Sequence, residues 1–180
     1  MSTAAFKVVK LTGVNGATET DTSENPGWLS ADVHDANPSN HQVGVPDAVS
    51  SPNYSYECQT AYKCTVAPNK QCVNFKYFGP AVQPDADDTP GNKMTVYAGT
   101  TEAPVTPTNS ASSVATTVQH SNYFGPGAGE YLAIGVVPDD DMIDAVGEYT
   151  HCLVTQLKVE DQAQRGAIAT VPYSIEYDES

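Results

Sequence analysis

Residues 54–66, YSYECQTAYKCTV, alternate between two sets of side chains with a period of two. Successive side chains of a β-strand point to opposite faces, so this pattern predicts a strand with one packed face and one solvated face. The face expected to be packed carries Tyr54, Tyr56, Cys58, Tyr62, Cys64 and Val66. The face expected to be solvated carries Ser55, Glu57, Gln59, Lys63 and Thr65.

Short apolar or alternating runs recur along the rest of the chain. Strands are expected at 5–14, 71–78, 93–99, 113–119, 130–137, 149–159 and 167–177. The turn residues Pro68 and Asn69 predict a hairpin between 54–66 and 71–78, because proline presets φ and asparagine tolerates the left-handed conformation. This succession of short strands favours one all-β domain over residues 1–180, an antiparallel β-sandwich of jelly-roll or immunoglobulin-like type.

Two stretches depart from the strand pattern. Residues 15–53 lose all periodicity and predict an irregular arm, with Trp28 and Leu29 as its anchor. A loop this long is usually functional or interface-forming, so the arm either contacts a partner or docks back on its own sandwich. Residues 138–148, PDDDMIDAVGE, predict one short helix, because Pro138 and the acids after it suit a helix start and Gly147 suits its end.

Charge excludes several classes of partner. The chain has 22 acidic and 8 basic residues and a net charge of -14. Nucleic-acid binding requires clustered Lys and Arg, so neither nucleic acid nor an anionic membrane is an expected partner. The N-terminal run AFKVVKLTGV alternates rather than forming a signal-peptide core, and no stretch approaches the roughly 20 apolar residues of a membrane span. We therefore expect synthesis in the cytoplasm.

Motifs that carry chemistry are absent from the sequence. Asp85, Asp87 and Asp88 suggest a calcium loop, but the sixth and twelfth positions are Pro90 and Val96 instead of Gly and Glu. The four histidines form no metal-ligand pair, and no nucleophile elbow or phosphate loop occurs. We therefore predict no enzyme, and no catalytic, cofactor-binding or metal-ligating residue.

Four cysteines, Cys58, Cys64, Cys72 and Cys152, leave the redox state open. A hairpin symmetric about Pro68 would set Cys64 opposite Cys72, within disulfide reach. Cys58 and Cys64 would lie roughly 20 Å apart on one strand, which is too far. The possible disulfide is therefore Cys64–Cys72, and the alternative is four reduced cysteines that act as small core residues.

Several stretches resemble small structural proteins of tailed bacteriophages, over about residues 54–180. The resemblance is carried by NFKYFG, MTVYAGTTEAPVTPTNSASSVATT, EYLAIGV and TQLKVEDQAQRGAIATVPYSIEYDES. It implies a virion protein made in the host cytoplasm: an exterior capsid decoration or cement protein, or a tail or neck accessory. Its partners would be major capsid or tail subunits, in a homo-oligomer or lattice. The cysteines and the DDDMIDAVGE stretch are not features of that group.

Residues 96–117 then become a candidate assembly surface. They are nearly all Thr, Ser, Ala, Pro and Val with one charge, Glu102. Such a segment favours extended backbone and can lie along a neighbouring subunit, or it can fold over its own sandwich. The expected assembly contacts are Trp28, Leu29, Thr100, Thr101, Pro104, Val105 and Pro107. The alternative function is a carbohydrate- or receptor-binding module that stacks ligands on Trp28 and the tyrosines.

Overall fold

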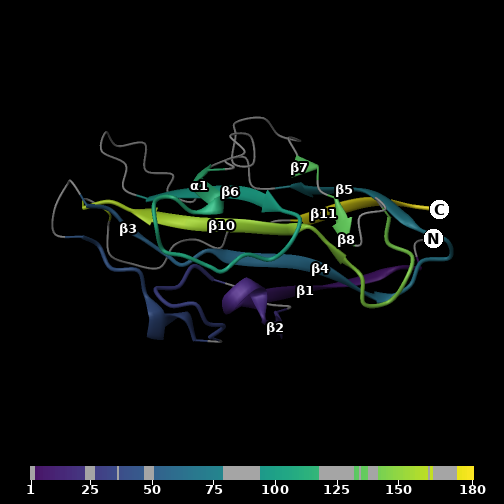
Figure 1. Ribbon diagram of the computed structural model, residues 1–180, viewed down its shortest axis with the longest axis horizontal. Helices are drawn as coiled ribbons and strands as arrows, with labels where there is room; N and C mark the ends of the chain where they lie inside the picture. The colour runs from purple at the N-terminus through teal and green to yellow at the C-terminus, as the bar shows by residue number, and fades with distance from the viewer. Residues whose placement is uncertain are drawn as a thin grey trace.

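Two antiparallel β-sheets form the framework of the described part of the chain in the computed structural model (Figure 1). The structure describes residues 3–22, 27–35, 37–46, 51–78, 94–117, 132–133, 135–137, 142–161, 163 and 174–180. Among these residues strand dominates and helix is confined to short turns, so the predicted all-β, sandwich-like fold class is confirmed.

The large sheet runs in the order β2-β1-β4-β10, and β3 and β6 both pair with β10. Its strands are β1 (Ala5–Thr12), β2 (Thr18–Asp21), β3 (Asn53–Tyr54), β4 (Cys58–Val66), β6 (Met94–Thr101), β8 (Val136–Val137), β9 (Tyr149–Thr150) and β10 (Cys152–Val159). The second sheet has the order β11-β5-β7, from β11 (Ser174–Glu179), β5 (Cys72–Phe78) and β7 (Leu132–Ala133).

The predicted hairpin between 54–66 and 71–78 is wrong. β4 pairs with β1 along one edge and with β10 and β9 along the other, so it has no free edge for β5. The chain instead leaves the large sheet at Val66 and enters the second sheet at Cys72, where β5 pairs with β11 and β7. Turn residues predict a reversal of the chain, but they do not say which strand the chain meets afterwards.

The predicted helix at 138–148 is also wrong over its described part, residues 142–148. Ile143 forms a β-bridge with Cys72. The Gly147 N–H donates to the Cys64 carbonyl, and the Cys64 N–H donates to the Glu148 carbonyl. With Gly147 at φ +100°, this is a glycine β-bulge against β4. The apolar residues that indicated a helix face therefore serve a β-like segment that touches both sheets, while 138–141 lie outside the described residues.

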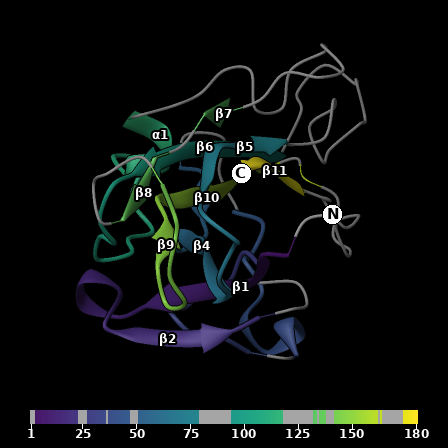
Figure 2. The same ribbon diagram turned by 90° about the vertical axis from the view of Figure 1, so that its right-hand side faces the viewer.

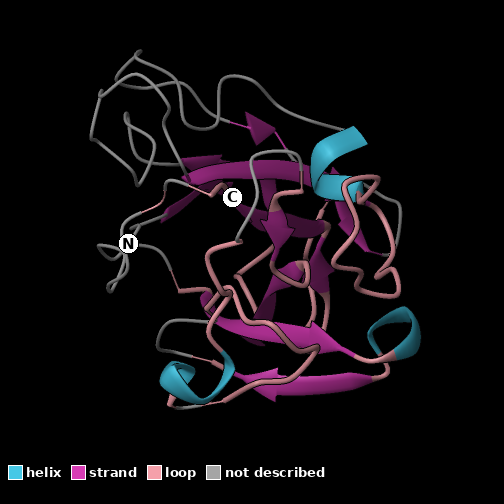
Figure 3. Ribbon diagram, turned by 90° about the vertical axis from the view of Figure 1, so that its left-hand side faces the viewer, coloured by secondary structure: helices cyan, strands magenta, loops and turns pink. Residues whose placement is uncertain are grey.

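Among the described residues, helices occupy only short stretches (Figure 3). They are α1 (Val114–Thr117) and the 3-10 turns η1 (Val14–Gly16) and η2 (Pro38–His41). The strand expected at 113–119 is therefore wrong over 114–117. The prediction of an irregular arm is wrong at Thr18–Asp21, because these residues form β2 and pair with β1. The expected strand 130–137 is split between the sheets, because β7 pairs with β5 and β8 with β9.

Both faces of the large sheet are covered. One face packs on the second sheet, where Phe6, Phe75 and Tyr177 form an aromatic cluster with ring centroids 4.9–5.7 Å apart. Val9, Leu11, Ala61, Cys152 and Val154 point to the other face and pack with Ala115 of α1. We call this second face the helix face, after α1.

The two chain ends meet at one pole of the molecule (Figure 1). The main-chain N–H of Thr3 donates to both carboxylate oxygens of Glu179, at 3.0 and 2.8 Å. Ser180 and Gln71 exchange main-chain hydrogen bonds beside them. The first and last strands are thereby fixed next to each other.

Candidate functional site

Residues 102–113, which we call the strap, connect β6 to α1 and contact the large sheet. Gln59 of β4 is fully buried, and its side-chain amide meets the main chain of Val105. Nε2 donates to the Val105 carbonyl at 2.7 Å, and Oε1 accepts from the Val105 N–H at 2.9 Å. A side chain of the sheet thus reproduces the two-bond pattern of a β-ladder.

Glu57 binds three main-chain N–H groups of the strap and α1. Its Oε2 accepts from Thr108 at 3.1 Å, and its Oε1 accepts from Val114 and Ala115 at 2.7 and 3.3 Å. Burial raises the pKa of this carboxyl, and the three N–H bonds oppose that rise without cancelling it. Glu57 therefore satisfies the N–H groups that the start of α1 leaves without an intrahelical partner.

Gln156 of β10 is the third side chain that holds the strap. Its Nε2 donates to the carbonyls of Thr108 and Ser110 at 3.1 and 3.3 Å, and its Oε1 accepts from the Ser113 hydroxyl at 2.7 Å. Ser55, Gln59 and Gln156 are each 0% exposed. The face of residues 54–66 that was expected to be solvated is therefore buried at Ser55, Glu57 and Gln59, because the strap covers it.

The strap also contacts the start of the arm at η1. The Asn15 N–H donates to the Thr106 hydroxyl at 3.1 Å, and that hydroxyl donates to Asn15 Oδ1 at 3.2 Å. A Cβ on Gly16 would lie 2.5 Å from Pro104 Cβ, so only glycine permits this approach. The two segments expected to make assembly contacts therefore contact each other at this corner.

The seven predicted assembly residues are buried or half-buried. Leu29 is 3% exposed, and the Trp28 indole N–H donates to the Thr155 hydroxyl at 3.0 Å. Of the strap residues, Pro107 is buried while Pro104 and Val105 are half-buried. Thr100 and Thr101 pair with Leu153 and Cys152 in the sheet. These residues contact their own sandwich, and their contact with a partner stays a prediction.

The outer side of the strap is different in character. Its exposed residues are Glu102, Ala103, Thr106, Asn109, Ser110, Ala111 and Ser112. Glu102 is the one charged residue between 94 and 117 in a chain of net charge -14. The structure thus presents a small, polar and nearly uncharged surface on a backbone that buried side chains hold in place.

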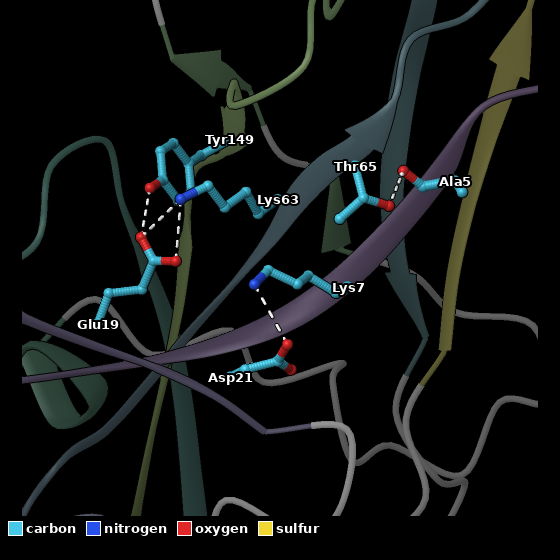
Figure 4. Close-up of polar contacts among 7 residues, drawn as sticks. All are labelled: Ala5, Lys7, Glu19, Asp21, Lys63, Thr65 and Tyr149. Carbon is cyan, nitrogen blue, oxygen red and sulfur yellow. Dashed lines mark hydrogen bonds and ion pairs between the residues drawn. The ribbon is translucent and has the colours of Figure 1, made fainter.

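A second polar cluster crosses the helix face beyond the strap (Figure 4). Lys63 Nζ lies 2.9 Å from both carboxylate oxygens of Glu19, and the Tyr149 hydroxyl donates to the same carboxylate. Lys7 Nζ bonds Asp21 Oδ2 at 3.2 Å. Burial works to raise the pKa of Glu19, but the bonds from Tyr149 and Lys63 outweigh it, so the pKa lies below its usual value.

Two of the cysteines, Cys64 and Cys72, lie together in one core cluster. All four cysteines are buried free thiols, and the hairpin that would have set Cys64 opposite Cys72 does not form. Burial raises the pKa of Cys72 to about 11 and that of Cys152 to about 12. No group of three metal-ligating side chains occurs among the described residues. Asp85, Asp87 and Asp88, whose loop fails the calcium pattern, lie outside them.

The aromatic side chains considered for ligand stacking are largely engaged within the protein. Tyr62 and Tyr77 are buried and stack on each other, with centroids 5.4 Å apart. Trp28 packs against the core cluster that contains them. Tyr54, Tyr56 and Tyr97 are half-buried, and Tyr123 lies outside the described residues. No described helix has the length and apolar character to cross a membrane.

These features define an all-β protein of the antiparallel sandwich type, with a strap locked onto its large sheet. The chain matches no protein-family model, and no curated protein or solved structure is significantly similar to it.

Proposed function

We propose that this protein is a non-enzymatic structural component of a bacteriophage particle, most simply an exterior decoration or cement protein, with a tail or neck accessory as the nearest variant. The observation that carries the proposal is the charge of the strap. Its exposed outer side is nearly uncharged, although the chain as a whole is strongly acidic. The buried core of a protein–protein interface is depleted in charged residues, and packaged DNA would repel this chain.

The rigidity of the strap supports the same role. Binding by a loop that is already ordered avoids the entropy cost of immobilising it on contact. Here Glu57, Gln59 and Gln156 fix the strap through its main chain, so its outer side chains are free to contact another subunit. The partner would be a major capsid or tail subunit, and the location would be the virion surface.

Two measurements test this function. Mass spectrometry of gradient-purified particles of the encoding phage should find the chain at a fixed ratio to the major capsid protein, and its absence from intact particles would overturn the proposal.

The purified protein should also rebind to particles that lack it. Ser112→Glu on the strap should weaken this rebinding at least tenfold, while Ser51→Glu, at another exposed position, should leave it unchanged. Glycan-array binding without particle binding would favour the carbohydrate-binding alternative.

A further inference from the structure

The edge strand β2 is open on its outer side. β2 pairs with β1 through Val9↔Asp21, Lys10↔Thr20, Leu11↔Glu19 and Thr12↔Thr18, and in the described part of the chain nothing pairs with its other edge. Figure 2 shows it as the outermost ribbon of the sheet. Natural edge strands are usually protected by shortness, charged side chains, proline, a bulge or a covering segment. β2, TETD, is short and carries two acidic side chains, but it has neither proline nor lysine and pairs in unbroken register.

The hydrogen-bonding pattern identifies which main-chain groups point outward. The Thr22 N–H donates to the Val8 carbonyl at 3.0 Å, so in this register Thr20 and Thr18 also occupy hydrogen-bonded positions toward β1. Hydrogen-bonded and non-hydrogen-bonded pairs alternate along antiparallel strands. The N–H and C=O groups of Glu19 and Asp21 therefore point away from the sheet.

The charges of β2 are compensated from the neighbouring strands. Its two acidic side chains lie on the helix face, where Lys63 of β4 bonds Glu19 and Lys7 of β1 bonds Asp21 (Figure 4). The chain has only eight basic residues, and two of them neutralise this one edge. Two copies that repel elsewhere through a net charge of -14 each can approach here without facing bare carboxylates.

We propose that two copies of this protein associate edge to edge by antiparallel pairing of β2 with its own symmetry mate. A two-fold axis through Thr20 places Glu19 opposite Asp21 of the second copy, and Asp21 opposite its Glu19. Each of these pairs exchanges two main-chain hydrogen bonds, which makes four in total. The association joins the two large sheets into one continuous sheet. It stands whether or not the protein belongs to a virion.

The ion pairs explain why this register is acceptable. Glu19 and Asp21 of opposite copies become cross-strand neighbours on one face, and uncompensated like charges in that position are destabilising. Lys63 and Lys7 remove that repulsion. Four main-chain bonds over a four-residue strand form a small interface, so the association is weak and depends on a high local concentration.

Thr20 gives a direct test, because symmetric non-hydrogen-bonded residues lie about 4.5 Å apart between Cα atoms, within disulfide reach. Thr20→Cys should form a disulfide-linked dimer when concentrated protein is oxidised with oxidised glutathione. The control Asn69→Cys, exposed at the turn after Pro68, should not. Failure of Thr20→Cys to cross-link, or equal cross-linking by both variants, overturns the proposal.

Sedimentation velocity over a concentration series of the full-length protein supplies the second test. Asp21→Pro removes an outward N–H and should abolish dimerisation, whereas Asp21→Asn, which keeps that N–H, should retain it. Lys7→Gln leaves Asp21 uncompensated and should weaken dimerisation several-fold at low salt, with recovery at high salt. Wild-type protein that stays monomeric at the highest concentrations, or Asp21→Pro and Asp21→Asn behaving alike, contradicts the edge-to-edge dimer.

Discussion

The side-chain amide of Gln59 pairs with the main chain of Val105 as a neighbouring strand would, with one hydrogen bond to the carbonyl and one from the N–H. Gln59 is completely buried, so its own amide group has no water as an alternative partner. The conformation of the strap therefore depends on a residue of β4 rather than on the sequence of the strap.

Gln59→Leu keeps the approximate volume of the side chain and removes both bonds. Leaving a buried polar group without a partner costs about 1–3 kcal/mol, so we expect a loss of unfolding free energy in that range. Hydrogen exchange at the Val105 amide should accelerate at the same time. The matched control is Gln42→Leu, at an exposed position, which should change neither quantity. Equal effects of the two substitutions would contradict the role of Gln59.

Glu57 predicts a dependence of stability on pH. Because burial raises its pKa in the folded state, the native protein holds this proton more tightly than the unfolded chain does. Its contribution to stability is present below the usual value of 4.5 and is lost as the pH rises through the elevated folded pKa. Urea denaturation should therefore be carried out from mildly acidic to neutral pH. Across this window the unfolding free energy of wild type should fall relative to that of Glu57→Gln.

The His151 ring packs directly against Gly135. A Cβ at Gly135 would fall 2.4 Å from His151 Cε1, and the His151 N–H donates to the Gly135 carbonyl at 2.9 Å. Gly135→Ala should cost about 1–3 kcal/mol through overpacking. Because the clash is with one ring, His151→Ala in the same chain should recover part of that loss. A double-mutant cycle by thermal denaturation measures the coupling, and strict additivity would show that the strain lies elsewhere.

Position 147 requires glycine for a different reason, which is its positive φ angle. At φ +100° it occupies a region unfavourable to other residues, while no atom lies within 4 Å of where a Cβ would be. Gly147→Ala should therefore cost about 1–2 kcal/mol from the backbone alone. Gly44→Ala is the control, because that glycine has no positive φ and its Cβ would make only an ordinary contact with Asn53. Chemical denaturation of the two variants provides the comparison.

The cysteines predict slow reaction with thiol reagents in the native state. All four are buried, and the raised pKa values of Cys72 and Cys152 leave those thiols protonated near neutral pH. Titration with a chromogenic disulfide should detect almost no thiol in native protein and four after denaturation without reductant. Two thiols in the denatured sample would instead reveal a Cys64–Cys72 disulfide.

Side-chain alternation predicts the strands of this protein better than it predicts their neighbours. Most of the run at 54–66 becomes β4 and most of the run at 149–159 becomes β10, because local alternation and β-propensity agree there, while Tyr54 belongs to β3 and Tyr149–Thr150 form β9. Alternation cannot say that a strap will cover the polar side of β4, since Val105 and Thr108 lie far along the chain from Gln59 and Glu57. The signal that was available is chemical: Gln59 and Gln156 are uncharged amides on faces where a solvated strand usually carries charge.

The two helix errors have one physical cause. α1 is four residues long, too short to form on its own, and it depends on Glu57 and Ser113 to bind its first N–H groups. Conversely, the apolar spacing of Met142, Ile143 and Val146 resembles a helix face, but pairing with Cys72 and Cys64 outweighs that local preference. In both segments a long-range partner decides the structure.

Because Thr3 and Glu179 are hydrogen-bonded to each other, the distance between the two ends of the chain reports whether the protein is folded. Two fluorophores attached at the ends would be in close proximity while the first and last strands stay in place, and would separate by tens of ångströms when the chain unfolds. Energy transfer between them would follow unfolding in real time without disturbing the strap or the edge of the large sheet.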